Sequence, residues 1–289
     1  MARRRKPATP IDSTSLRGTA VLLTGASGSI GSEVARQLGA RGAKLALSAR
    51  QEDRLRALAS EIEAAGGAPP VVLAEDLGRR GNAQRLADRA TEALGTVDVL
   101  VNNAGVTMQA LTWVAGDGDE AREVFETNLW SPFALVKALA PGMLERGRGV
   151  IVNVSSMAGL SPIPRLGIYA ASRAGLALAT EVMGLELGPR SVRVVEVVFG
   201  PIDTPTANEN RVLGGVKMNK RALGKLEPAA EAIVNAVAGD TEGVVFYPRM
   251  LRVSQTFPGL MRRISRMTAG KADVHDTTVV LGTGKPAGS

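Results

Sequence analysis

The chain lacks several residue types on which common enzyme chemistries depend. Its 289 residues include no cysteine, a single histidine and only 3% aromatic residues. Without cysteine there is neither a disulfide framework nor thiol catalysis. The only histidine, His275, lies in a polar stretch near the C-terminus, so a histidine-based triad is excluded and no metal site is expected. Because the basic residues have no aromatic residues interleaved for base stacking, nucleic-acid binding is not indicated.

Long apolar runs are also lacking, and the charge is unevenly distributed. No apolar stretch reaches about 18 residues, the length that a membrane-spanning helix needs. The basic start, Met1–Lys6, is not followed by the apolar core of a signal peptide, which favours a cytoplasmic protein. Of the net charge of +7, residues 1–17 carry +4 and residues 249–289 carry +5. The body, residues 18–248, is therefore nearly neutral at −2, and residues 1–17 are expected to form a basic disordered tail.

A glycine-rich run, Thr24–Gly31, is the first pattern that indicates a binding site. It follows apolar residues and precedes a helical pattern of apolar positions. Such a turn lets the backbone approach a pyrophosphate, which the free N–H groups and positive dipole of the helix N-terminus attract. A tight turn without a ligand is the alternative, but the strand–loop–helix context favours dinucleotide binding. The candidate residues are Gly25, Ser27, Gly28, Ser29, Ile30 and Gly31.

A second apolar run ends in amide and small residues. Residues 96–101 lead into Asn102, Asn103, Ala104 and Gly105. Small residues would let a flat ring lie against the backbone, while Asn103 fixes the end of the strand. By itself, the pattern is also consistent with an ordinary turn.

A serine, a tyrosine and a cation form the third pattern. Ser156 ends a short apolar strand, and Tyr169 follows it by thirteen residues. Arg173 comes four residues after Tyr169, so on a helix the phenol and the permanent cation share one face. The cation favours the phenolate, and a hydroxyl tuned in this way can exchange a proton while a hydride moves. The alternative is that Ser156 caps a turn and Tyr169 simply begins a helix.

Together, these patterns resemble the short-chain dehydrogenase/reductase family over residues 17–248. The resemblance implies a single Rossmann-type domain that binds a nicotinamide cofactor. It also implies that Asn128 would hold a water of the proton relay, that Ser156 would polarise a carbonyl, and that Tyr169 would be the acid/base. The residues that carry the resemblance, in their order and spacing, are the run 24–31, the run 102–105, Asn128, Ser156, Tyr169 and Arg173.

The fourth catalytic position departs from the family, which has a lysine where this chain has Arg173. In the family that lysine hydrogen-bonds the nicotinamide ribose, favours the phenolate and passes protons toward solvent. Arginine can do the first two but not readily the third, because it does not deprotonate in proteins. Two smaller departures are a middle glycine at Gly28 instead of Ser29, and Phe199 where proline is usual.

The end of the second expected strand bears on the choice of cofactor. Residues 43–48 end without the acidic side chain that would hold the ribose hydroxyl of NAD. Arg50 follows, and arginine is suited to clasp a phosphate, so NADP(H) is favoured over NAD(H). The alternative is that Arg50 is a solvated loop cation and that Asp76 caps a helix. The further cofactor contacts that the resemblance implies are Asp76, Leu77, Asn103, Ala104, Gly105, Tyr169, Arg173, Gly200, Ile202 and Thr204.

Alternating strand and helix patterns predict one α/β domain, a doubly wound parallel sheet with helices on both faces. The expected strands are 19–24, 43–48, 70–74, 97–101, 149–154, 192–198 and 243–247. The expected helices are 29–41, 52–65, 79–94, 119–145, 169–187 and 228–238.

Residues 202–226 interrupt this alternation at the place where the family has a substrate lid. Leu213, Val216 and Met218 could form an apolar wall there, so an apolar carbonyl or alcohol is the expected substrate. Arg165 is interpreted as a solvated loop residue, with a contact to an anionic substrate group as the alternative.

The basic C-terminal extension, residues 249–289, contains an amphipathic pattern near 258–268. Its apolar stripe is Leu260, Met261, Ile264 and Met267, with arginines elsewhere. Such a helix can lie on an anionic membrane surface, or it can dock on its own domain or on a partner subunit. The chain after Gly270 is expected to be a disordered tail.

The sequence therefore predicts an NADP(H)-dependent oxidoreductase that interconverts a carbonyl and an alcohol. Hydride moves from the nicotinamide to the carbonyl carbon, Ser156 and Tyr169 bind the oxygen, and Tyr169 protonates it. The alternative is a dinucleotide-binding regulatory or scaffold protein in which Arg173 has ended turnover. The resemblance also implies a homodimer or homotetramer that pairs through the long helices following the fourth and fifth strands.

Overall fold

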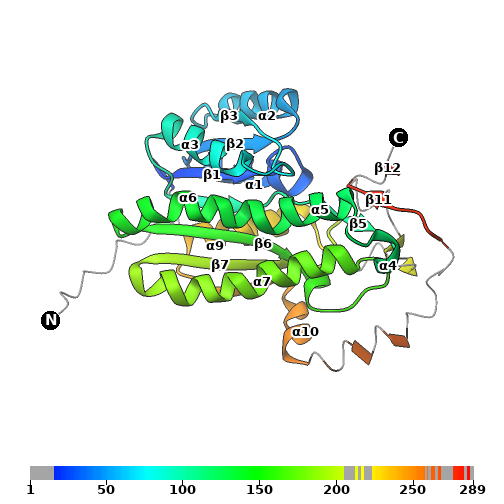
Figure 1. Cartoon of the computed structure of the whole chain (residues 1–289). Helices are drawn as coiled ribbons and strands as arrows, with labels where there is room; N and C mark the ends of the chain where they lie inside the picture. Colours follow the sequence, from blue (N-terminus) through cyan, green and yellow to red (C-terminus); the bar gives the residue numbers. More distant parts are fainter. Residues whose placement is uncertain are drawn as a thin grey trace.

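The computed structural model describes residues 16–204, 223–257 and 276–282, with the short pieces 212–213, 216–217, 259, 262–263, 266–267 and 285–286. A seven-stranded parallel sheet lies at its centre, in the order β10-β7-β6-β4-β1-β2-β3 (Figure 1). Its inner strands are buried runs of valine, leucine and isoleucine, as a parallel sheet covered on both faces requires. The strands are β1 Ala20–Thr24, β2 Lys44–Ala49, β3 Val71–Ala74, β4 Val99–Asn102, β6 Gly149–Ser156, β7 Val192–Phe199 and β10 Gly243–Tyr247.

Helices cover both faces of this sheet. One face packs against α1 (Ser29–Ala40), α2 (Glu52–Ala64) and α9 (Leu226–Ala238). The other packs against α3 (Asn82–Leu94), α6 (Ser131–Arg146) and α7 (Gly167–Leu187). Each helix buries apolar positions spaced three or four residues apart, such as Val34 and Leu38 of α1. The predicted doubly wound α/β fold is thereby confirmed.

The strand order reverses between β1 and β4, which are neighbours in the sheet. The loops that follow these strands therefore leave the same edge of the sheet side by side. In doubly wound sheets, ligands bind at this reversal, beyond the carboxyl ends of the strands.

The segment predicted as one uninterrupted helix over 119–145 differs from that prediction in its middle. It consists of α5 (Asp119–Phe125), a π-helical turn η1 (Glu126–Trp130) and α6. Asn128 is at the centre of the π turn, where its buried side chain bonds both backbone groups of Val106 at 2.9 Å. A π turn inserts one residue into the helix, and such insertions are common at functional sites.

Residues near the C-terminus also differ from expectation. The strand β11 (Val280–Leu281) pairs antiparallel with β5 (Met108–Gln109). Arg165 lies 2.9 Å from the carboxylate of Asp276 and donates to the carbonyls of Asp276 and Thr278. The prediction of a disordered tail is therefore wrong for residues 276–282, and Arg165 is a partner of this segment instead of a solvated loop residue or a free contact for an anionic substrate.

Several further predictions concern segments at the ends and in the lid. Leu16, assigned to the N-terminal tail, is fully buried and its N–H donates to the carbonyl of Arg41. In the lid, β8 (Val212–Leu213) and β9 (Val216–Lys217) form an antiparallel pair, whereas Met218 lies outside the described residues. No helix in the described part of the chain combines the length and the apolar character needed to cross a membrane.

Candidate active site

Thr24 and Asn103 join the ends of β1 and β4. The Thr24 hydroxyl donates to the carbonyl of Val101 and accepts the N–H groups of Asn103 and Ala104, each at 3.0 Å. The Asn103 side chain donates in turn to the carbonyls of Thr24 and Gly25. These bonds fix the two loops against each other at the reversal of strand order.

Glycines keep this junction free of side chains. Gly25 has a φ of +66°, and a Cβ there would lie 2.8 Å from Cα of Ala104. A Cβ at Gly31 would lie 2.1 Å from the carbonyl oxygen of Gly25. Helix α1 begins here after Gly28, with no side-chain cap and no acidic residue in its first turn. Its unsatisfied N–H groups, at the positive end of the helix dipole, fit the pyrophosphate of a dinucleotide.

Tyr169 and Arg173 lie one turn apart near the start of α7. The guanidinium carbon of Arg173 is 5.4 Å from the centroid of the Tyr169 ring, close enough for a cation to interact with the ring face. Nη1 of Arg173 donates to the carbonyl of Val154 on β6 at 3.1 Å. Its Nε is buried without a hydrogen-bond partner, and among the described residues no carboxylate forms an ion pair with this side chain.

Gly105 provides the space that the Arg173 guanidinium occupies. A Cβ at Gly105 would lie 1.9 Å from Nη2 of Arg173 and 3.3 Å from Oδ1 of Asn128. The residue Arg173 is 7% exposed, so a larger residue at position 105 would have to displace a buried group. The loop after β4 is therefore shaped around an arginine.

The side chain of Asn128 holds the loop that contains Gly105. Its Oδ1 accepts the N–H of Val106, and its Nδ2 donates to the Val106 carbonyl and to the Ser172 hydroxyl at 3.1 Å. The Ser172 hydroxyl then donates to the carbonyl of Tyr169 at 2.7 Å. Both N–H groups of the Asn128 amide are used, so a relay water at this residue would have to donate to its Oδ1 or bind its backbone. The sequence prediction missed Ser172, although its place directly before Arg173 on the same helix was a usable signal.

Ser156 is the last residue of β6 and caps the short 3₁₀ helix η2 (Met157–Gly159). Its Oγ accepts the N–H of Ala158 at 3.2 Å, which leaves the hydroxyl hydrogen free to donate. Helix η2 packs tightly on α7, since a Cβ at Gly159 would lie 2.9 Å from the backbone nitrogen of Ala174. The capping role and a catalytic role of Ser156 are thus compatible.

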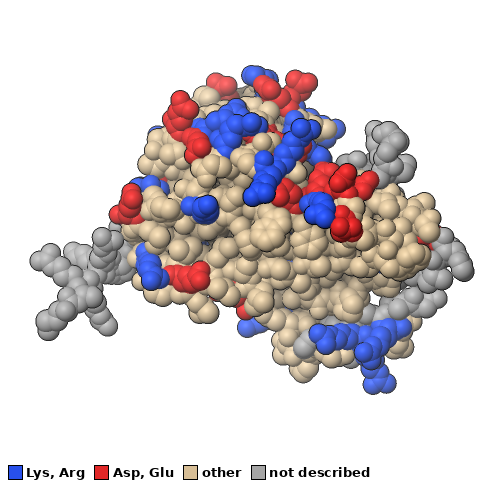
Figure 2. All heavy atoms as spheres, viewed as in Figure 1, with Lys and Arg blue, Asp and Glu red and all other residues tan. Residues whose placement is uncertain are grey.

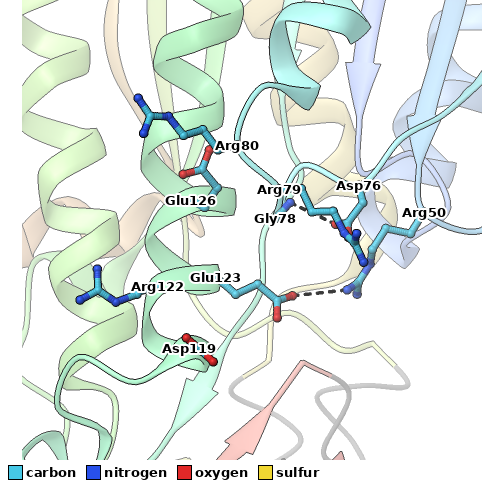
Figure 3. A pocket seen from close by; sticks show the side chains of 9 residues that line it. All are labelled: Arg50, Asp76, Gly78, Arg79, Arg80, Asp119, Arg122, Glu123 and Glu126. Atoms are coloured by element: carbon cyan, nitrogen blue, oxygen red, sulfur yellow. Dashed lines mark hydrogen bonds and ion pairs between the residues drawn. The ribbon is translucent and has the colours of Figure 1, made fainter.

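A pocket of about 430 Å³ opens beyond the ends of β2 and β3 (Figure 3). We call it the arginine pocket. Arg50 points into it, and its Nη1 lies 3.5 Å from Oε1 of Glu123, which reaches across from α5. The pocket is lined by four arginines, four carboxylates and one glycine, namely Arg50, Arg79, Arg80, Arg122, Asp76, Asp119, Glu123, Glu126 and Gly78.

The carboxylates of the arginine pocket are held in different ways. Asp76 accepts the N–H of Gly78 at 3.1 Å and pairs with Arg79 at 3.3 Å, so it closes a turn in the loop after β3 and does not cap α3. Burial raises the pKa of Glu126, an effect that the positive charge of Arg80 partly opposes. The sequence analysis identified Arg50 and Asp76, which directly follow the second and third strands. It missed the pocket residues from α5, from η1 and from the loop after Asp76, because these lie outside the patterns that end the two strands.

The remaining predicted cofactor contacts lie around the same edge of the sheet. Leu77 is buried, and its carbonyl accepts the Ser131 hydroxyl at 2.7 Å. Ser27 and Ser29 flank Gly28, and Ile30 packs against the core from α1. Gly200, Ile202 and Thr204 follow β7.

Gly200 is held closely by the residues after β10. Its N–H donates to the carbonyl of Tyr247 at 3.0 Å, and a Cβ there would lie 2.9 Å from Cδ1 of Leu251. Phe199, which stands where proline was expected by resemblance, packs edge-on against the Tyr247 ring with centroids 6.3 Å apart. Ile202 is buried and bridges to Gly224.

The doubly wound sheet and the glycine cradle at its reversal of strand order have the form of a dinucleotide-binding scaffold. Residues 19–212 match the family described as short chain dehydrogenase. This chain therefore belongs to the short-chain dehydrogenase family, whose members bind a nicotinamide dinucleotide.

Individual relatives resemble the chain over most of its length. It is 30% identical over 262 residues to "Ketoacyl reductase HetN" of Nostoc sp., covering 88% of this chain and 90% of that protein. It is 32% identical over 244 residues to "11-beta-hydroxysteroid dehydrogenase-like 4A" of Arabidopsis thaliana, covering 84% and 80%. Among solved structures, a metagenomic short-chain oxidoreductase in complex with NADP has 31% identity and a TM-score of 0.67, covering 81% of this chain and 97% of that one.

Proposed function

We propose that this chain is an NADP(H)-dependent oxidoreductase that interconverts a carbonyl and an alcohol, with Tyr169 as the acid/base. The observation that carries the proposal is the buried guanidinium of Arg173, 5.4 Å from the Tyr169 ring and without a carboxylate partner in the described part of the chain. The guanidinium places a fixed positive charge beside the phenol, where it would stabilise negative charge that develops on a substrate oxygen bound by the Tyr169 hydroxyl. Tyr169 can then protonate a developing alkoxide, or accept the proton of an alcohol in the reverse direction.

A bound reduced nicotinamide supplies the hydride. Ser156 orients the carbonyl, because its hydroxyl accepts from Ala158 and keeps its hydrogen for the substrate oxygen. Arg173 stands at the position of the family's lysine, which holds a ribose hydroxyl, and its guanidinium would provide the N–H donors for that contact. Arginine does not deprotonate in proteins, so the proton that Tyr169 gives up must return by a route that bypasses Arg173.

The preference for NADP(H) is supported by the arginine pocket. Arg50 has only a 3.5 Å ion pair to Glu123 there, and 58% of its side chain is exposed. A phosphate would replace that single, half-buried carboxylate with a charge-assisted, bidentate partner. Arg79 and Arg80 line the same pocket beside the carboxylates of Asp76 and Glu126, and a phosphate could compete with these carboxylates for them.

An apolar substrate is supported by the cluster beside Tyr169. Val106, Met108 and Val124 form a buried group against which Ile168, the neighbour of Tyr169, is packed. The relatives named as a ketoacyl reductase and a hydroxysteroid dehydrogenase-like protein also suggest carbonyl and alcohol groups on apolar skeletons.

A homodimer is supported by an exposed apolar face on α6 and α7. Leu178, Val182 and Leu185 follow one stripe of α7 and are 66%, 44% and 78% exposed. Trp130, 54% exposed, packs edge-on against Phe133 at the start of α6. We propose that a second copy covers this face, alone or within a tetramer.

The proposal is tested by measuring the oxidation of NADPH and of NADH against a panel of apolar aldehydes and ketones. Turnover with NADPH is expected for at least one apolar carbonyl. The scaffold alternative predicts a different result, in which NADPH binds in a fluorescence titration but no carbonyl is reduced. Binding of NADPH and NADH with equal affinity would contradict the assigned cofactor preference without contradicting the reaction.

A further inference from the structure

The residues after β10 form a basic arm on the outside of the body. We define the arm as the described residues 249–257, 259, 262–263 and 266–267, which include five arginines and no acidic residue. All five arginines are exposed, and no ion pair involving them is seen among the described residues. In Figure 2, blue spheres gather along the lower edge of the molecule, where Figure 1 has α10, and no red spheres lie among them. The arginines are Arg249, Arg252, Arg262, Arg263 and Arg266.

The arm also exposes large apolar side chains. Met250, Val253, Phe257 and Met267 are 76%, 47%, 58% and 77% exposed. The first three are spaced three and four residues apart, over a 3₁₀ turn (Arg249–Leu251) and the helix α10 (Arg252–Thr256), so they share one side. A soluble surface rarely carries such a group of apolar side chains without a binding partner.

The opposite side of the same turn and helix attaches the arm to the body. Ser254 is 3% exposed, and Leu251 packs against the position where Gly200 has no side chain. Beyond the arm, β11 pairs with β5, and Arg165 holds Asp276. The chain is thus attached on both sides of the arm, next to the segment after β7 and next to the loop that leads into Tyr169.

We propose that the arm docks the protein on an anionic lipid surface. Arginines interspersed with exposed Met, Val and Phe side chains match a surface that offers negative headgroups above an apolar interior. Nucleic acid would need a series of stacking aromatics, and the arm has only Phe257. A second copy would bring five more positive charges against this arm, whereas the exposed face of α7 has apolar residues without that repulsion.

Docking through the arm would turn the substrate entrance toward the lipid. Both attachment points of the arm, Gly200 and Arg165, belong to loops at the carboxyl edge of the sheet, where the proposed catalytic residues lie. An apolar carbonyl dissolved in the membrane could then reach the site without crossing water. This last consequence rests on the proposed function, whereas lipid binding by the arm does not.

Lipid binding is tested by sedimenting the full-length chain with vesicles of phosphatidylcholine alone or mixed with phosphatidylserine. We expect binding to the anionic vesicles only, weakened by salt because screening shortens the reach of the arginines. Each arginine near an anionic surface contributes about fivefold to the partition coefficient, so Arg262→Glu with Arg263→Glu should lower it at least about 25-fold. The matched control is Arg54→Glu with Arg56→Glu on the exposed side of α2, far from the arm, which should leave partitioning within about twofold.

A second variant tests the apolar contribution. Phe257→Ser should lower partitioning at every salt concentration, while the melting temperature stays that of the parent because the side chain is exposed. The proposal is overturned if the parent chain fails to bind anionic vesicles, or if the Arg262/Arg263 variant binds them as the parent does. It is also overturned if that variant changes the oligomeric state measured by light scattering while vesicle binding persists, since the arm would then be a protein interface.

Discussion

The two cationic regions of the candidate site differ in burial and in pairing. Arg173 is 7% exposed and forms no ion pair within the described chain, whereas the side chain of Arg50 is 58% exposed and lies 3.5 Å from Glu123. A buried charge acts through a low effective dielectric, whereas an exposed one is screened by water and salt. The same residue type can therefore occur here in two settings, as a fixed buried charge and as an exposed cation that could exchange its carboxylate partner for a ligand.

The two regions also differ in the carboxylates near their arginines. The groups around the Arg173 guanidinium are uncharged. They are the backbone carbonyl of Val154, the Tyr169 ring and the backbone at Gly105, which has no side chain. The arginine pocket contains four carboxylates beside its four arginines. The charge of Arg173 is therefore not neutralised by a nearby carboxylate. In the arginine pocket, by contrast, the carboxylates offset the positive charge and so limit non-specific binding of anions.

The largest expected effect is that of removing the phenol. Tyr169→Phe should lower kcat by about 10²–10⁴-fold with NADPH affinity unchanged, because the ring and its packing remain while the proton donor is lost. Tyr247→Phe is the matched control, since it removes the only other tyrosine hydroxyl, which accepts the N–H of Lys225 at 3.1 Å. Steady-state rates and a fluorescence titration give both quantities. Equal losses of rate in the two variants would mean that Tyr169 is not the acid/base.

The next test concerns Arg173, the buried cation. Arg173→Met removes the charge beside Tyr169 and should lower kcat about 10²-fold, comparable to the loss of a preorganised electrostatic contact. Arg173→Lys keeps the charge but cannot reproduce the bond from Nη1 to Val154 in a space that fits a guanidinium. We therefore expect the lysine variant to fall between the parent and Arg173→Met. A lysine variant faster than the parent would show that proton relay, which arginine cannot perform, limits the rate.

At the exposed side, the expected effect is on binding and not on chemistry. Arg50→Asp should weaken NADPH by about 10- to 100-fold, the value of a charge-assisted phosphate contact of roughly 1.5–3 kcal/mol, with NADH little affected. Arg54→Asp, an exposed arginine on α2 outside the pocket, is the control for the change in net charge. Glu123→Gln frees Arg50 from its partner and should tighten NADPH by a few-fold. If Arg50→Asp weakens NADPH and NADH equally, the assignment of Arg50 to the phosphate is wrong.

The parts of the molecule that sequence patterns predicted well are those whose causes are local. Apolar runs predicted all seven strands of the sheet within about two residues, and they did so most directly for the inner strands, which are buried on both faces and therefore apolar. The spacing of Tyr169 and Arg173 predicted their contact, since one helical turn separates them. The glycine run also predicted the start of α1 correctly, because the turn and the first helical residues are adjacent in the sequence.

The parts that differed depend on residues far apart in the chain. Arg165 pairs with Asp276, more than a hundred residues away, so its neighbours along the sequence could not reveal its partner. The π turn at Asn128 depends on bonds to Val106, which an apolar period does not encode. The arginine pocket joins Arg50 to Glu123 across two segments of the fold, which a motif after one strand cannot include. Whether the predicted residues bind a cofactor stays a prediction.

The smallest expected effect extends the comparison to a buried charge of opposite sign. Glu196 on β7 is 3% exposed, and its Oε1 has no hydrogen-bond partner. Burial raises the pKa of Glu196 from 4.5 to about 7, the nearby Ser155 hydroxyl lowers it in part, and the charge of Glu181 raises it further. Unlike Arg173, Glu196 can avoid the free-energy cost of a buried charge by remaining protonated and neutral.

The sign of the effect on stability follows from proton binding. Between 4.5 and about 7 the folded chain keeps the Glu196 proton that the unfolded chain releases, so the free energy of unfolding falls as pH rises through this window and is level above it. The decrease due to this group amounts to roughly 3 kcal/mol, or several degrees in Tm. Glu196→Gln should remove the decrease, so its Tm relative to the parent should rise between pH 5 and pH 8. Glu63→Gln, which changes an exposed carboxylate on α2, should follow the parent at both pH values. Parallel melting curves for the parent and Glu196→Gln would show that Glu196 ionises normally in the folded protein.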